Sequence, residues 1–174
     1  MQPRHKNKFK FVLVTSDSCM HCSIFKQNIL TNLQDAIVLK YKNQLDWLHI
    51  NIPTFELHEE RGYPRGLRNL INWFPIILLI PNDLWESDDL TKGLERIRIL
   101  NGRIRNGKSE IERKYNMNLE DILRWVNEEL RNISTSDDMM RNENLRSRDF
   151  EEKNSYWRPK KQRFRERRLI NFNL

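Results

Sequence analysis

The hydrophobic residues fall into short apolar runs separated by polar segments. Residues 9–15 (FKFVLVT) form a compact run rich in Val and Phe, which predicts a buried strand. Over 23–33 the apolar positions recur at the spacing of one helical face, which predicts a helix. Two apolar segments follow, 36–41 and 47–52. We expect one or both to be strands, and Pro53 ends the second because proline cannot donate to a ladder.

The most hydrophobic stretch lies near the middle of the chain, at residues 74–80 (FPIILLI). It predicts a central strand with Pro75 at its entrance, where a missing N–H is tolerated. We expect a short helix before it, around 67–71, and a polar acidic loop after it, over 81–92. Residues 94–100 alternate between two faces, which predicts a half-exposed strand with isoleucine inward and arginine outward.

Turn and helix signals follow the central strand. The Asn-Gly dipeptides at 101–102 and 106–107 are typical of hairpin turns. Residues 119–130 place five apolar side chains on one stripe, and Asn118 is positioned to cap this helix. The order of elements predicts an α/β fold, with a mixed central sheet flanked by helices and a basic C-terminal extension.

Charge is distributed unevenly along the chain. The 174 residues include 31 Lys and Arg against 24 Asp and Glu, a net charge of +7. Eight basic residues and one acid lie within 153–174, so this segment carries the whole excess and the rest of the chain sums to zero. We therefore expect a domain over 1–133, a polar linker over 134–152, and a basic aromatic tail over 153–174 that is disordered or docked on a partner.

The tail interleaves aromatic and basic residues, which suits a nucleic-acid backbone with rings available for stacking. The same composition suits an anionic membrane surface, and a solvated extension without a partner is the plain alternative. The residues expected to contact nucleic acid are Arg158, Lys160, Lys161, Arg163, Arg165, Arg167 and Arg168.

Composition also argues against several protein classes. No run approaches the ~18 apolar residues of a membrane span. The apolar run near the N-terminus is shorter than the ~7–15 residues of a signal peptide, so we expect a reducing, cytoplasmic location. Asparagine is abundant, at 19, and alanine occurs once. We interpret this as the mark of an AT-rich genome, such as that of a large DNA virus or a protist, and packaging in a virion is consistent with it.

Residues 102–109 fit the phosphate-loop pattern G-x-x-x-x-G-K-S letter for letter. A true phosphate loop follows a buried parallel strand and opens a long helix. Here the preceding strand is predicted to be half-exposed, and the turns explain both glycines. We therefore do not expect nucleotide binding.

Cys19 and Cys22 are the only cysteines, and they lie where the first predicted strand ends and the first helix begins. A helix N-terminus carries unpaired N–H groups and about half a positive charge, which stabilise a thiolate. Cys19 is then the exposed residue of the first turn, Cys22 lies one turn further in, and His21, when protonated, adds positive charge near Cys19. This spacing beside a βαβ pattern is typical of redox motifs. Two alternatives stay open: inert core cysteines or half of a metal site.

On these residues the chain resembles the thioredoxin superfamily from about Lys8 to Asn132. The matching features are the Val-rich first strand, the C-x-x-C motif opening a helix, the Phe74-Pro75 pair before an apolar strand, and the last helix at 119–130. The resemblance implies a cis proline beside the cysteine pair. It also implies that the backbone of Phe74 pairs with bound substrate.

The activity that the resemblance implies is thiol–disulfide exchange on protein disulfides or dithiols, without a metal or an organic cofactor. Cys19 attacks, Cys22 resolves the mixed disulfide, and His21 tunes the potential. Histidine before the second cysteine is similar to the disulfide-forming and isomerising branches of the family. The residues implied to shape the substrate groove are Met20, Phe74 and Pro75. The alternative is a non-catalytic thioredoxin-like scaffold or virion component whose tail binds nucleic acid.

Several features differ from the family pattern, among them a bulkier residue at Phe74 and a longer segment between Cys22 and Pro75. Ser18 stands where thioredoxins have tryptophan before the first cysteine. Leu13 stands where they have a buried acid that aids proton transfer from the second cysteine. His49 lies near the place of a family lysine on the next strand and is a candidate to substitute for it in part. We therefore expect an activity that differs from that of the reducing thioredoxins.

Overall fold

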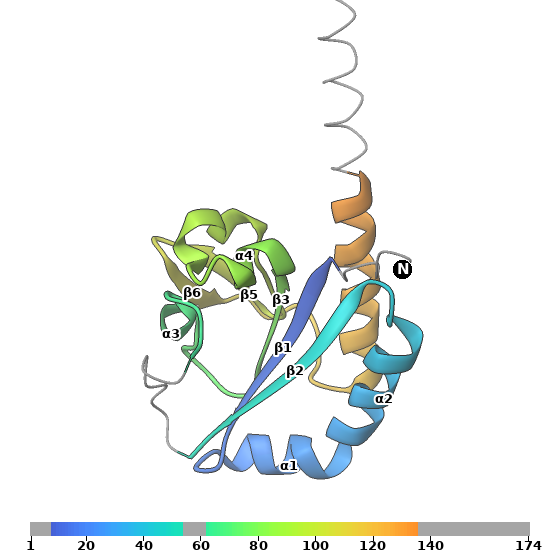
Figure 1. The fold of residues 1–174 in the computed structure, drawn as a ribbon. Coiled ribbons are helices and arrows are strands. Elements are labelled where there is room, and N and C mark those ends of the chain that lie inside the picture. The colour runs from blue at the N-terminus through green and yellow to red at the C-terminus, as the bar shows by residue number, and fades with distance from the viewer. Residues whose placement is uncertain (1–7, 54–61, 136–174) are drawn as a thin grey trace, which may run out of the picture. The chain divides into compact units, whose positions relative to one another are not determined.

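The computed structural model describes residues 8–53 and 62–135 of the chain (Figure 1). The chain divides into two units, residues 1–130 and 131–174. The sheet and the cysteine pair belong to the first unit. The basic tail predicted over 153–174, and most of the linker predicted over 134–152, lie outside the described residues.

Three long strands form one half of a six-stranded mixed sheet, whose order is β2-β1-β3-β4-β5-β6. β1 (Phe9–Ser16) is parallel to β2 (Leu45–Ile52) and antiparallel to β3 (Ile76–Pro81). The strand predicted at 9–15, the one predicted at 47–52 and the proline-led central strand are confirmed. All six residues of β3 are buried, which explains its continuous apolar sequence.

Three short strands complete the sheet through antiparallel pairs: β4 (Arg98–Ile99), β5 (Gly102–Arg105) and β6 (Lys108–Ile111). Asn106 and Gly107 join β5 to β6 with φ of 51° and 75°, as a two-residue hairpin of type I′ requires. Residues 102–105 and 108–111 are strands and no helix follows in the described chain until residue 119, so the phosphate-loop lookalike is a β-hairpin.

Two consecutive helices connect β1 to β2, α1 (Met20–Asn28) and α2 (Leu30–Lys40). The apolar segment 36–41 therefore lies mostly in a helix, and of the two strands considered at the sequence level only 47–52 is one. The helix buries Leu33 and Ile37 one turn apart, while Leu39 stays 73% exposed. A short apolar run does not by itself distinguish a strand from a buried helix face.

The segment after β3 departs from prediction. The expected loop over 81–92 contains α4 (Asn82–Glu86) and the start of the 3-10 helix η2 (Leu90–Arg96), because Leu84 and Leu90 anchor this acidic segment in the core. The expected strand over 94–100 is reduced to β4, because residues 94–96 belong to η2. The short helix at 67–71 is confirmed as α3 (Leu67–Leu70).

The last described helix begins at residue 119 and runs to 135, further than the predicted end at 130. Its N-terminus is capped as predicted, because the Asn118 Oδ1 accepts from the backbone N–H of Asp121 at 2.8 Å.

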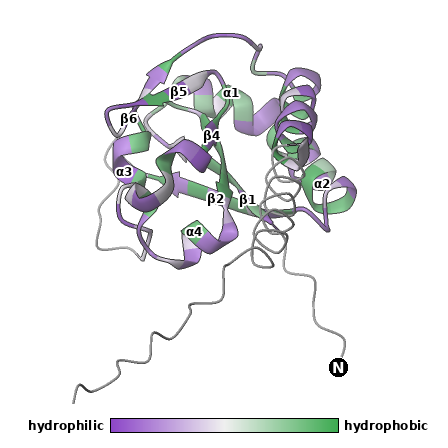
Figure 2. Cartoon of the chain, turned by 90° about the horizontal axis from the view of Figure 1, so that it is seen from above, coloured by the Kyte–Doolittle hydropathy of each residue, from purple (hydrophilic) through white to green (hydrophobic). Residues whose placement is uncertain are grey.

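The sheet has a buried core on each face. Val12 and Val14 of β1 pack with residues of α3, α4 and η2 in one cluster. Their neighbours Phe11 and Leu13 point to the opposite face and are also fully buried. The helices that follow β1 and the helix from 119 contribute further buried residues, among them Phe25, Leu33, Ile37, Ile122 and Val126. Figure 2 shows this distribution, with hydrophobic residues concentrated on the central strands.

Candidate active site

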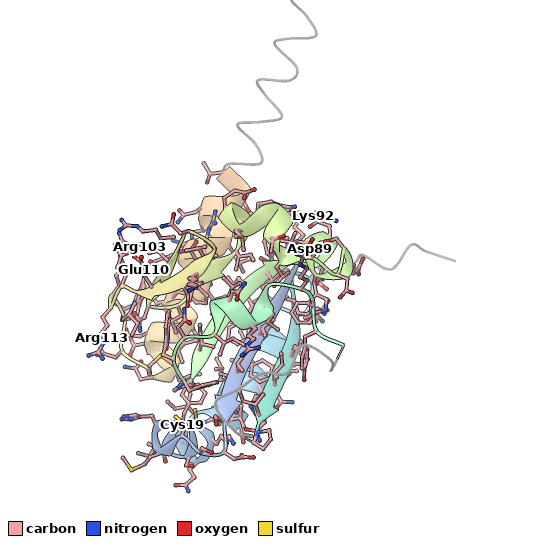
Figure 3. All side chains as sticks on the ribbon, turned by 90° about the vertical axis from the view of Figure 1, so that its left-hand side faces the viewer. Cys19, Asp89, Lys92, Arg103, Glu110 and Arg113 are labelled. Atoms are coloured by element: carbon pink, nitrogen blue, oxygen red, sulfur yellow. The ribbon has the colours of Figure 1, made fainter. Side chains whose placement is uncertain are left out.

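The cysteine pair occupies the junction between β1 and α1. Cys19 is the N-cap of α1, with extended backbone angles (φ −104°, ψ 113°), and its Sγ accepts the backbone N–H of Cys22 at 3.2 Å. The sulfur thus occupies the place that a Ser or Asp oxygen takes in an ordinary N-cap. The expectation of an exposed first-turn residue is wrong: Cys19 precedes the first turn and is 9% exposed. It is labelled at the lower end of the molecule in Figure 3.

Cys22 lies in a more enclosed environment than Cys19. Its side chain has no exposed surface, and its Sγ accepts the backbone N–H of Ser16 at 3.5 Å. Burial, together with the side-chain hydrogen bond to Cys19, raises the pKa of Cys22 to about 12. Both cysteines are free thiols. The pair therefore combines a sulfur at a helix start with a sulfur held neutral in the core.

Phe74 meets the pair from a distant part of the sequence. The Phe74-Pro75 peptide bond is cis, as the resemblance implied. The Cys19 thiol donates to the Phe74 carbonyl oxygen over a sulfur–oxygen distance of 3.8 Å. Phe74 and Pro75 immediately precede β3, which pairs with β1. This pairing explains why a residue 55 positions away reaches Cys19.

A groove of about 470 Å³ lies next to the pair. Neither cysteine is among its lining residues, and Cys19 meets it through its contact with the Phe74 carbonyl. One wall is α1 and the residue after it, the floor is the segment 73–75, and the other wall is the segment 111–117 with Asn101. Of the residues expected to bind substrate or tune the site, His21, Phe74 and Pro75 line the groove. Met20 is 71% exposed and is not among the lining residues.

Asn101 holds the second wall in place. Its Oδ1 accepts the backbone N–H groups of Lys114 and Tyr115 at 2.9 and 2.8 Å, and its Nδ2 donates to the Tyr115 carbonyl at 2.8 Å. The Tyr115 hydroxyl donates in turn to Glu128. Asn101 adopts a left-handed φ of 57°, which asparagine tolerates better than most residues. The sequence marked this residue only as part of a turn.

The groove also contains residues that sequence patterns did not single out. These are Trp73, Ile111, Arg113, Tyr115, Asn116 and Met117. Gly102 sets the position of Trp73, because a Cβ on this glycine would lie 2.7 Å from the Trp73 ring. Nothing in the local pattern of 111–117 predicts a binding wall, since its role depends on its approach to α1.

A polar network lies on the face of β1 and β2 opposite to Val12 and Val14 and includes Lys26 of α1. The buried Thr15 hydroxyl donates to the Asn51 Oδ1 at 2.7 Å and lies 2.8 Å from the His49 Nε2. Because the hydroxyl has one proton, the His49 Nε2 carries the hydrogen in their bond. Lys26 and Asp17 complete the network through Asn51 and each other, with distances of 2.6 to 3.0 Å.

His49 pairs in register with Leu13 on β1. Burial, and next the nearby charge of Lys26, lowers the pKa of His49. Among the described residues its hydrogen bond goes to Thr15, while the fully buried Leu13 fills the position of the family's acid. The idea that His49 substitutes for a family lysine stays a prediction.

Three other questions of function concern the predicted nucleic-acid contacts, a metal site and a membrane span. The seven basic residues expected to contact nucleic acid lie in 158–168, outside the described residues. Within 8–53 and 62–135, no three His, Cys, Asp or Glu side chains gather in a way that would hold a metal ion. In the same ranges, no helix is long and apolar enough to cross a membrane.

Comparison of the chain with protein-family models, with curated proteins and with solved structures gave no match. The function is therefore inferred from the geometry and chemistry of the site.

Proposed function

We propose that this protein is a thiol–disulfide oxidoreductase with a thioredoxin-like fold, and that Cys19 and Cys22 exchange disulfides with protein substrates. The observation that carries the proposal is the inequality of the two cysteines. The Cys19 sulfur accepts an N–H at the start of α1 and borders the groove floor at Phe74. Cys22 is fully buried, with its pKa raised to about 12. One sulfur is placed to attack, and the other is kept as a thiol until the attack has occurred.

The exchange follows from this arrangement. Cys19 loses its proton to solvent and attacks one sulfur of a substrate disulfide. The substrate S–S bond breaks, a bond to Cys19 forms, and the leaving sulfur takes a proton from water. Cys22 then loses its proton and attacks the Cys19 Sγ, which releases the second substrate thiol. The substrate gains two electrons and the pair becomes a disulfide; with a dithiol substrate the same steps run in reverse.

Residues around the pair have distinct roles in this proposal. The backbone of Phe74, next to Cys19, is placed to pair with an extended substrate segment, and Pro75 shapes the groove floor. His21 lines the groove and tunes the potential of the pair. Met20 extends outward from the start of α1, where it contacts the flanks of a large substrate. The reaction requires only the two thiols and an external thiol or disulfide partner.

Cys22→Ser provides the direct test. After reaction with a protein disulfide, this variant should retain a mixed disulfide at Cys19, because nothing resolves it. Cys19→Ser is the matched control and should retain none. Wild type equilibrated in glutathione buffers, quenched with acid and then alkylated in denaturant, should show one two-electron transition, seen as the loss of both alkylation sites by mass spectrometry. If neither result is obtained, the oxidoreductase proposal fails, and the alternative function, a non-catalytic scaffold or virion component, is favoured.

Nucleic-acid binding by the basic tail is a separate proposal, supported by the +7 charge of residues 153–174. Affinity for single-stranded DNA or RNA should fall steeply with salt and should be lost on deletion of 153–174. Unchanged affinity in the deletion variant would exclude the tail as the binding element.

A further inference from the structure

The groove beside the cysteine pair is mostly apolar and open to solvent. Ile24 of α1 and Ile111 on the opposite wall are 50% and 56% exposed. Trp73 and Met117 add further apolar surface. Exposed apolar side chains gathered around one groove mark a surface that binds another molecule.

One charge in this groove is uncompensated. Arg113 lines the second wall and forms no hydrogen bond or ion pair in the described part of the chain. Nearby carboxylates already have partners: Glu112 pairs with Lys114 at 3.5 Å, and Glu110 lies 3.3 Å from Arg103. Figure 3 shows Arg113 extending outward, apart from the Arg103–Glu110 pair.

The remaining titratable side chains of the groove do not offset Arg113. Among the described residues, no Asp or Glu lines it, and its other titratable side chains are those of His21 and Tyr115. The Tyr115 hydroxyl is engaged with Glu128. On the part of the groove that the structure describes, an entering segment therefore meets a largely apolar surface that carries the positive charge of Arg113 and no carboxylate.

We propose that the groove binds an apolar segment of the substrate protein flanking its reactive cysteine, and that an Asp or Glu in this segment pairs with Arg113. This inference rests on the proposed function, because the segment is defined by its position next to the substrate cysteine that reacts with Cys19. Arginine presents a planar fork that matches a carboxylate in two parallel hydrogen bonds. A basic residue in the same place would meet like charge, so the groove selects for acidic substrates and against basic ones.

The test compares three sets of synthetic peptides. Each peptide carries one cysteine as a mixed disulfide with 2-thiopyridine, an apolar flank, and Glu, Gln or Lys at two to four residues from the cysteine. The second-order rate of thiopyridone release should be about two- to fivefold higher for the best Glu peptide than for its Gln counterpart, the range of a partly exposed ion pair. Raising the salt should shrink the difference.

Variants assign the preference to one side chain. Arg113→Gln should remove it, and Arg113→Glu should reverse it in favour of Lys peptides. Arg103→Gln is the matched control, because Arg103 lies on the neighbouring hairpin outside the groove, and it should keep the preference. A preference that survives in Arg113→Gln, or that is absent in wild type, overturns the inference.

Two further measurements separate this inference from the proposed function. The rate with 2-hydroxyethyl disulfide, which has no flanking segment, tests the chemistry alone. It is measured for wild type and for Arg113→Gln, and the peptide rates of each are divided by it before they are compared. Binding of peptides with Ser in place of Cys, followed by calorimetry, tests the groove alone and should be tighter for Glu than for Gln. Reaction with the small disulfide but no Glu preference in rate or binding overturns only the groove assignment. Glu-selective binding without any reaction overturns only the proposed thiol–disulfide exchange activity.

Discussion

The backbone N–H of Cys22 donates to the sulfur of Cys19 at 3.2 Å, so one cysteine caps the other at the start of α1. The capping sulfur contacts the carbonyl of Phe74, which lines the groove, and the donor residue has its own sulfur buried against Ser16. Because these environments differ, the two thiols should differ in reactivity and in their contribution to stability.

Alkylation should distinguish the two thiols. With iodoacetamide at pH 8, the native reduced chain should be modified at Cys19 and not at Cys22, because the thiolate is the reactive form and the pKa of Cys22 is raised to about 12. In denaturant both should react. Peptide mapping by mass spectrometry gives the site. Equal rates at both cysteines in the native chain would contradict the buried placement of Cys22.

Stability should fall at alkaline pH through Cys22. The unfolded thiol ionises near its ordinary value of 9.0, whereas the folded thiol stays protonated up to about 12. The contribution of Cys22 to the free energy of unfolding is therefore complete below about pH 9. It is lost as the pH rises from about 9 to about 12, by at most about 1.4 kcal/mol per pH unit. Urea unfolding in the presence of reductant at pH 8 to 10.5 measures the slope, which should be shallower in Cys22→Ser. An identical slope would remove Cys22 as the cause.

Stability should also fall at mildly acidic pH through His49. Burial lowers the pKa of His49 below 6.5, so as pH drops the unfolded chain takes up this proton before the folded chain does. The stabilisation is complete above about pH 6.5 and is lost below it. His49→Gln keeps a donor for Thr15 but cannot be protonated, so its unfolding free energy should decrease less than that of wild type between pH 7.5 and 5. The difference in unfolding free energy between His49→Gln and wild type at pH 7.5, where His49 is neutral in both states, measures the effect of the substitution on packing and is subtracted from the difference at pH 5.

Asn101→Ala should destabilise the chain more than Asn106→Ala does. Both asparagines adopt a left-handed φ before a glycine, but only Asn101 bonds the second wall of the groove. The lost hydrogen bonds should make the difference about 1–3 kcal/mol. Urea unfolding of the two variants measures it. Equal losses would mean that the wall does not depend on the Asn101 amide.

Gly102→Ala should disturb the groove floor. The new Cβ would lie 2.7 Å from the Trp73 ring and 3.0 Å from Ile99, and overpacking of this kind costs about 1–3 kcal/mol. Binding of the Ser-substituted peptides should weaken as Trp73 moves. Gly107→Ala is the control: it has open space around the Cβ but a left-handed φ of 75°, so it should lose stability without losing peptide binding.

The sequence predicted the parts of the fold where apolar residues are dense and local. β3 is buried along its whole length, and Cys19 and Cys22 lie within one helical turn, so neither depends on distant partners to be recognised. The segments 36–41 and 81–92 were harder, because a few buried leucines and isoleucines decide their structure and these become anchors only when the sheet is present.

The site was predicted on one side only. His21, Phe74 and Pro75 are adjacent in sequence to recognisable motifs, and the structure brings all three to the groove. Asn101 and Arg113 belong to the opposite wall, about which local patterning is silent. Their positions follow from backbone hydrogen bonds between 101 and 114–115 that form only when the chain closes.

This two-walled groove has a consequence for how the protein could be redirected. The wall formed by α1, next to the cysteine pair, and the wall bonded to Asn101 come from different stretches of chain, and different hydrogen bonds hold them. If the proposed function holds, substitutions along 111–117 should change which partners bind while leaving thiol–disulfide exchange at the two cysteines unchanged. The second wall is then the place to introduce new recognition.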